Sequence, residues 1–236
     1  MLSKDARRDV AGTNGKKARP QHSVWGVATL ERTQDRSKNS PVAFLSLKGE
    51  GGYFSAVAFR QVASRLLSVE AGQGLAVVYF GHLEPKVEAD GKAKGSRLLI
   101  SQAYPAKSSA QVTPTQIRGF FTLLTAPEAK YTNSGDFLLR GLLGYREGAV
   151  PFSFWGEEAY AIADTLDKGA KVWVEGILRE EGWAASEGEK KRYELRLRVA
   201  SMLPLADASA EGEKGESPSG RQEDLPEFPD DLDLPF

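Results

Sequence analysis

Residues 150–178 read VPFSFWGEEAYAIADTLDKGAKVWVEGIL, and this segment decides the predicted fold. It begins with a short strand at 150–155 that alternates large apolar with other residues, and it ends with a second strand at 170–178. The residues between them, 157–166, have the apolar spacing of one helical face, and Gly169 follows as a stop signal. The apolar positions on that face are Ala159, Ile162, Ala163 and Leu166. The segment therefore predicts strand, short helix, strand.

Three more strands surround this unit. Segments 116–123 and 137–145 precede it, joined by the turn at 132–135, and segment 192–203 follows it. Five strands with one helix between the third and the fourth is the element order of an OB-fold, a small and partly open barrel.

The first half of the chain repeats this order. Its predicted strands and helix lie, in turn, at 24–30, 42–47, 53–59, 61–69 (the helix), 75–83 and 97–103. The repeat predicts an all-β protein with two tandem OB-folds, each a five-stranded barrel with one helix between strands 3 and 4.

Composition divides the chain into five parts. We expect a flexible basic arm at 1–22, a divergent first OB-fold at 23–104, a linker at 105–115, a second OB-fold at 116–205 and a disordered acidic tail at 206–236. In the tail, Gly, Ser, Pro and acidic residues dominate, so this segment buries too little apolar surface to offset its ordering entropy.

The formal net charge of −1 hides a segregation of charge. Residues 1–205 carry 29 basic and 22 acidic side chains, and residues 206–236 carry two basic and ten acidic ones. The neutral total therefore combines a basic body with an acidic tail, and it does not count against a nucleic-acid ligand.

The composition excludes several classes of protein. Hydrophobic residues make up 41%, which supports a packed core. The chain has no cysteine and only two histidines, which rules out disulfides and Cys- or His-based metal sites. We find no catalytic cluster or phosphate-binding loop, so we expect no enzyme activity, no cofactor and no metal. With no membrane span and no secretory signal, we expect a soluble, cytoplasmic protein.

Strand alternation places aromatic and basic side chains outside the second barrel. Trp155 shares a face with Ser153, opposite the apolar face of its strand. In the last strand Arg192, Arg196 and Arg198 face outward, whereas Tyr193, Leu195, Leu197 and Val199 face the core. Exposed aromatics among arginines suit single-stranded nucleic acid, since every base has a π-face and guanidinium groups contact phosphates.

Simpler interpretations remain open. An outward Trp on a short strand suits a subunit interface as well as a ligand, and for Trp173 we favour the interface. Three outward arginines also fit a solvated strand face, and Tyr131 fits a ring that packs over its own hairpin.

Three stretches of the second block resemble bacterial single-stranded DNA-binding proteins. Residues 126–135, APEAKYTNSG, resemble the first hairpin of that family, and 152–157, FSFWGE, resemble the third strand entering the helix. Residues 166–176, LDKGAKVWVEG, resemble the helix exit and the fourth strand. The three stretches lie in the family's order and at near-native spacing within 116–205.

This resemblance implies roles for individual residues. Trp155 and Trp183 stand at base-stacking positions, and Lys130 with Tyr131 match the basic-aromatic pair of the first hairpin. Tyr145 matches a further stacking position, although the loop after it is shorter than usual.

The first block resembles the family less closely. Phe59, followed by Arg60, occupies the place of Trp155, but Glu88 stands where Trp183 would be, and Trp25 has no aromatic counterpart. Two OB-folds in one chain resemble the Deinococcus–Thermus form, which implies a homodimer. We therefore expect this block either to bind DNA less well or to serve mainly in assembly.

The C-terminus resembles the acidic tip through which this family docks replication, repair and recombination proteins. The predicted docking residues are Asp230, Asp231, Leu232, Asp233, Leu234, Pro235 and Phe236. An aromatic end with a terminal carboxylate suits an apolar pocket with a basic rim, and the aspartates steer the encounter. Mere solvation does not explain that apolar end.

Two functions follow from these observations. The first is sequence-tolerant binding and protection of single-stranded DNA by a nucleoid-associated protein that recruits partners through its tail. The alternative is an assembly or recruitment protein, as in a primosome, whose DNA binding is weak or secondary. RNA remains a possible ligand, because stacking does not distinguish the sugar.

Overall fold

The computed structural model describes residues 21–50, 52–69, 75–87, 93–107, 110–146, 148–183 and 192–206. Most of the predicted arm and nearly all of the predicted tail, including its docking tip, lie outside these residues. His22, which we assigned to the arm, is the first residue of a strand and is 6% exposed.

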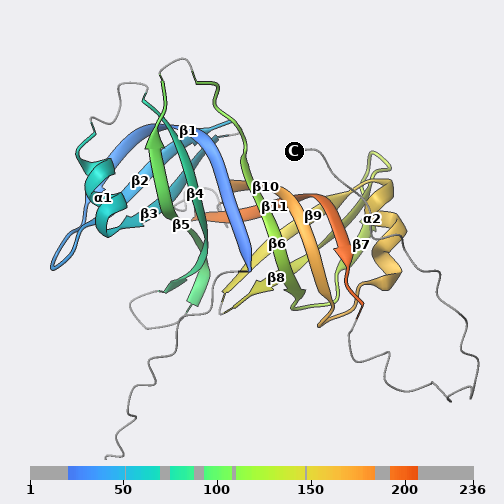
Figure 1. Cartoon of the computed structure of the whole chain (residues 1–236). Helices are drawn as coiled ribbons and strands as arrows, with labels where there is room; N and C mark the ends of the chain where they lie inside the picture. Colours follow the sequence, from blue (N-terminus) through green and yellow to red (C-terminus); the bar gives the residue numbers. More distant parts are fainter. Residues whose placement is uncertain are drawn as a thin grey trace, which may run out of the picture. The chain divides into compact units, whose positions relative to one another are not determined.

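The first barrel contains five strands and one helix, in the predicted order (Figure 1). Its elements are β1 (His22–Asp35), β2 (Val42–Gly49), β3 (Gly52–Phe59), α1 (Arg60–Leu67), β4 (Ala76–Val87) and β5 (Ala93–Pro105). Antiparallel pairs join neighbouring strands, and the parallel pairing of β3 with β5 closes the barrel.

The second barrel repeats this plan with one extra strand. Its elements are β6 (Thr115–Leu123), β7 (Glu128–Tyr131), β8 (Phe137–Tyr145), β9 (Gly148–Trp155), α2 (Glu157–Ile162), the 3₁₀ turn η1 (Ala163–Thr165), β10 (Lys171–Trp183) and β11 (Arg192–Pro204). The added strand, β7, forms a hairpin with β8, and the parallel pair of β9 and β11 closes this barrel. The prediction of two tandem OB-folds is confirmed.

A strand pair joins the two barrels into one sheet. β1 runs antiparallel to β6, from His22 opposite Gly119 to Trp25 opposite Gln116 (Figure 1, blue and green). The sheet therefore passes through both barrels without a break, in eleven strands. We call this strand pair the seam.

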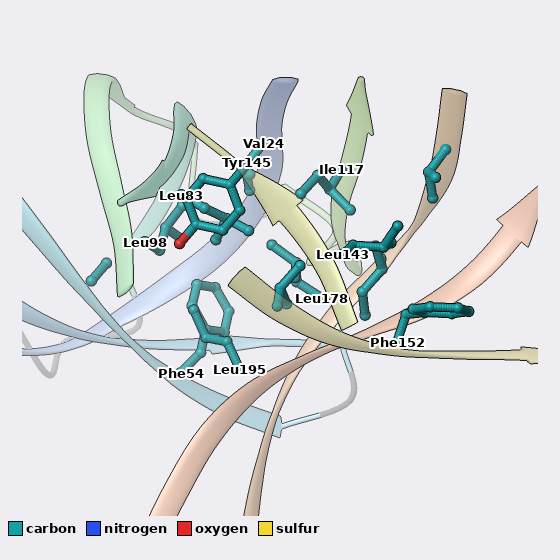
Figure 2. Packing of buried hydrophobic residues seen from close by; sticks show 14 of the residues in the cluster. Val24, Phe54, Leu83, Leu98, Ile117, Leu143, Tyr145, Phe152, Leu178 and Leu195 are labelled. Atoms are coloured by element: carbon teal, nitrogen blue, oxygen red, sulfur yellow. The ribbon is translucent and has the colours of Figure 1, made fainter. Parts of the chain in front are cut away.

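The buried side chains form one cluster that includes both barrels (Figure 2). Phe54 of β3 and Leu195 of β11 belong to it, as do Leu98 of β5 and Tyr145 of β8. At about 25 cal/mol per Å² of apolar surface removed from water, this shared core favours folding of the two barrels as one unit.

Candidate nucleic-acid interface

Trp155 is the last residue of β9, and its side chain lies outside the second barrel. It is 39% exposed, whereas Phe152 and Phe154 on the same strand are 4% and 2% exposed. The alternation of inward and outward side chains along β9 therefore follows the prediction. An exposed indole at a strand end presents a flat face that solvent reaches.

Three hollows border Trp155, and two of them together are lined by four arginines. One, of about 540 Å³, is lined among others by Arg140, Ser153 and Arg196. The other, of about 400 Å³, shares Trp155, Ser153 and Arg196 with the first and adds Arg179 and Arg198. We call these two hollows, which share Trp155, the tryptophan groove. Four arginines from three strands thus surround one exposed indole.

Strand register explains why the arginines gather there. Ser153 lies opposite Arg140 of β8 on one side and opposite Arg198 of β11 on the other. Arg196 lies two residues from Arg198 on the same face and opposite Arg179 of β10. Residues distant in sequence therefore meet on one outer face. The sequence indicated Arg196 and Arg198, but Arg140 and Arg179 were missed because they stand alone among apolar and acidic neighbours.

Carboxylates hold two of these arginines. Arg140 donates two hydrogen bonds of 2.9 Å to Glu128 of β7, and Arg196 lies 3.5 Å from Glu181 and 3.6 Å from Glu194. Such exposed pairs contribute little, roughly 0–1 kcal/mol, so a phosphate can replace the carboxylate. Among the described residues, Arg179 and Arg198 have no carboxylate within 4 Å.

The first hairpin presents the predicted basic-aromatic pair to solvent. Lys130 is exposed, and Tyr131 is 64% exposed. The Tyr131 ring also meets the edge of Phe137, with the ring centres 5.3 Å apart. The ring thus packs on its hairpin and still offers a free face.

Trp183 and Arg192 lie opposite each other at the far ends of β10 and β11. Their side chains are outside the described residues, so their binding roles stay predictions.

Two predictions about tyrosines are wrong. Tyr145 is only 5% exposed, and its hydroxyl donates a 2.7 Å hydrogen bond to Ser96 of the first barrel. A ring held between the barrels cannot stack on a base. Burial also raises the pKa of the Tyr145 hydroxyl to about 12. Tyr193, expected in the core, is 62% exposed because β10 and β11 run past the body of the barrel.

The first barrel has a related but less basic surface. Phe59 is partly exposed, and the Arg97 guanidinium lies 6.0 Å from the centre of its ring. Arg97 is also 3.4 Å from Glu84. Arg60 is exposed next to Phe59, and its role in DNA binding stays a prediction.

Register allows a position-by-position comparison of the two surfaces. Glu84 lies opposite Arg97, just as Arg179 lies opposite Arg196, so Glu84 stands at the position of Arg179. The register of the parallel pairs places Leu99 at the position of Arg198. The antiparallel pairs likewise place Phe44 where the second barrel has Arg140. The first barrel therefore carries an acid and two apolar residues at three of the four arginine positions. Its remaining cation, Arg97, is shared with that acid.

No protein-family model matches the chain. A single-stranded DNA-binding protein of Thermus thermophilus is 38% identical over 98 residues, which are 36% of this chain and 36% of that protein. The alignment thus spans about a third of the relative's length.

Two solved structures share the fold. The wild-type single-stranded DNA-binding protein of Thermus aquaticus superposes with a TM-score of 0.64 at 20% identity, covering 86% of this chain and 98% of the other. A deletion variant of that protein gives 0.66 at 19% identity, covering 80% and 96%. The chain resembles the Thermus single-stranded DNA-binding proteins. This likeness includes both barrels, since the structural match covers most of the chain.

No helix in the described part of the chain is long and apolar enough to cross a membrane. Within the same residues, no group of three or more His, Asp or Glu side chains is placed to hold a metal ion.

Proposed function

We propose that this chain binds single-stranded DNA with little sequence preference, through the tryptophan groove of the second barrel. The observation that carries the proposal is an exposed Trp155 surrounded by Arg140, Arg179, Arg196 and Arg198 on an OB barrel. A base stacked on an aromatic ring gains about 1–3 kcal/mol whatever its identity, and the arginines contact the adjoining phosphates. The similarity to the Thermus proteins supports the same ligand.

The test is a titration with oligo-dT of increasing length, followed by Trp fluorescence, with the mass of the complex measured in parallel. Quenching and a loss of affinity at high salt are expected. The Trp155→Ala variant should bind about fivefold or more weakly, since it loses one stacked base, and Trp155→Phe should retain part of the affinity. Absence of oligo-dT binding at low salt would exclude the proposal, and an unchanged Trp155→Ala variant would remove that residue from the site.

The acidic tip at 230–236 is proposed to recruit replication, repair and recombination proteins. Its terminal Phe236 and upstream aspartates suit an apolar pocket rimmed by basic side chains. Deleting residues 230–236 should abolish partner binding and leave oligo-dT binding intact. Partner binding that survives the deletion would contradict this role.

A homodimer is proposed to form through the outer face of β5, β4, β1, β6, β10 and β11. These neighbouring strands carry exposed or partly exposed apolar side chains on that face, namely Trp25, Phe80, Tyr104, Phe120, Trp173 and Leu203. Phe120 and Trp173 meet edge to face at 4.7 Å, and the Arg118 guanidinium lies 5.2 Å from the Trp25 ring centre.

A second copy is the expected occupant because the seam divides this face into two similar halves, which gives the self-complementary surface that a two-fold dimer needs. Sedimentation of the full chain should report a dimer, and Phe120→Glu should shift it toward the monomer. A wild-type monomer at all concentrations would contradict the dimer.

The scarcity of arginines on this surface of the first barrel favours the second candidate, an assembly protein with weak DNA binding. It predicts weak oligo-dT binding from the start and a biological activity that depends mainly on residues 230–236.

A further inference from the structure

The β10–β11 hairpin of the second barrel crosses onto the outer face of the first. β10 packs against β3 of the first barrel, where Ser55 lies near the Glu180 carboxylate. Burial raises the pKa of Glu180, while the neighbouring Ser55 and Lys86 oppose that shift. The carboxylate thus lies in a partly enclosed contact between two barrels.

The two faces of this hairpin serve different surfaces. Glu181 lines the tryptophan groove, whereas Glu180, the preceding residue, faces Ser55 of the first barrel. Successive residues of a strand point to opposite sides, so the hairpin separates the two surfaces. A DNA strand that leaves the groove for the first barrel has to pass this hairpin.

An exposed tyrosine lies on each side of the Ser55–Glu180 contact. Tyr53 is two residues before Ser55 on the same outer face of β3, and it is 55% exposed. Tyr193 lies opposite Gly182, two residues beyond Glu180, and is 62% exposed. Two large aromatic rings therefore face solvent where the barrels meet.

One ammonium group lies over the Tyr53 ring, and a second lies near Glu180. The Lys48 ammonium lies 5.6 Å from the centre of the Tyr53 ring, and Lys86 is close enough to Glu180 to lower the pKa of its carboxyl group. An exposed ring with a neighbouring ammonium is the combination that binds one base and its phosphate.

We propose that Tyr53 and Tyr193 form a stacking bridge that carries single-stranded DNA from the tryptophan groove to the first barrel, with Lys48 and Lys86 contacting its phosphates. The bridge rests on the proposed function, since it extends the same ligand past the hairpin. It assigns a DNA contact to four side chains that lie outside the groove and outside the surface around Phe59.

Two lengths of oligo-dT test the bridge in the full chain. A short strand of about 8 nucleotides fits within the site of one OB-fold, and a strand of about 30 nucleotides spans two. Tyr53→Leu and Tyr193→Leu should each weaken binding of the long strand about fivefold or more and leave the short strand unaffected. Tyr53→Phe and Tyr193→Phe keep the ring and should bind both strands as the wild type does.

Salt dependence gives a second readout. Lys48→Gln should reduce the slope of log affinity against log salt by about 0.7 for the long strand, the value for one lost phosphate contact, and leave the short-strand slope unchanged.

The outcomes separate the bridge from the proposed function. A wild type that binds neither strand overturns the function and the bridge together. A wild type that binds both strands, with Leu variants that keep full affinity for the long one, overturns the bridge alone. Leu variants that weaken both strands equally also overturn it, because the tyrosines then act through the fold.

Discussion

Val24 of β1 and Ile117 of β6 lie opposite each other in the seam, and they occupy equivalent positions in the two barrels. On its other side Val24 pairs with Gly81, and Ile117 pairs with Gly176. Each of these glycines directly follows a register shift in the fourth strand of its barrel. Both side chains are almost completely buried, at 0% and 1% exposure. The barrels are thus related by a local two-fold axis that passes through this pair.

The seam depends on a close approach at Gly119. A side chain there would overlap the backbone of His22 on β1. Gly119→Ala is expected to lower the free energy of unfolding by about 2 kcal/mol or more, because the two strands must separate to fit the methyl group. Denaturant unfolding of the full chain measures this change.

Gly135→Ala is the matched control. Gly135 also has a positive φ, of 88°, but has open space around it, so the substitution should cost only about 1 kcal/mol of backbone strain. Equal losses for the two variants would contradict a special role for the seam.

Stability should fall with acid because of His22. Its Nε2 accepts a 2.9 Å hydrogen bond from the Leu83 N–H, while Nδ1 has no partner among the described residues. Burial, with a smaller effect of the neighbouring His82, lowers the pKa of His22 from 6.5 to about 4. The unfolded chain therefore takes up this proton first.

The contribution of neutral His22 is complete above pH 6.5, and it is lost as pH falls toward 4. The loss approaches about 3 kcal/mol at its limit. His22→Gln keeps an acceptor without the titration, so its free energy of unfolding should change less than that of the wild type between pH 7 and pH 4. Parallel curves for the two proteins would contradict the assignment.

Arg179 and Glu84 stand at equivalent positions of the two barrels, and substitution can reverse the charge at each. Arg179→Glu should weaken oligo-dT binding and reduce the salt slope by about 0.7, the value for one phosphate contact. Glu84→Arg should strengthen binding and steepen the slope by a similar amount, because it also releases Arg97. Asp167→Arg changes the net charge as Glu84→Arg does, at an exposed turn outside the groove, so a like gain would contradict a local effect.

Arg60 holds a left-handed backbone, with φ of 54°, where the second barrel has Gly156 with φ of 84°. Both residues donate an equivalent backbone hydrogen bond, to Pro41 and to Phe137 respectively. An L side chain in this conformation costs about 1–2 kcal/mol. The first barrel therefore keeps an arginine where the backbone favours glycine.

Arg60→Gly should leave the free energy of unfolding unchanged or raise it by up to about 1 kcal/mol, and it should weaken binding of long oligo-dT. Arg60→Asn, which also tolerates this backbone, should behave alike. A destabilised Arg60→Gly variant would show that the arginine serves the fold, and full DNA affinity would remove it from the binding surface.

Local pattern was enough to predict both barrels and the exposure of Trp155. Alternation along β11 placed Leu195, Leu197 and Val199 in the core, where they are at most 5% exposed. The same rule was wrong at Tyr193, because alternation states which side a residue faces and not where the barrel ends. Tyr145 was assigned wrongly because its partner, Ser96, lies in the other barrel.

The seam itself was not predictable from the sequence. Its strands begin at His22 and Thr115 and read as ordinary first strands of two separate barrels. Only the three-dimensional structure pairs them.

The joining of both barrels in one chain has a consequence for how such a protein evolves. In an assembly of identical single-barrel chains, every substitution appears in all copies, so an acid that repels phosphate in one barrel repels it in each. Here the gene encodes the two positions separately, and Glu84 in one barrel coexists with Arg179 in the other. The two barrels can therefore differ in their cations, and natural selection can act on each half alone.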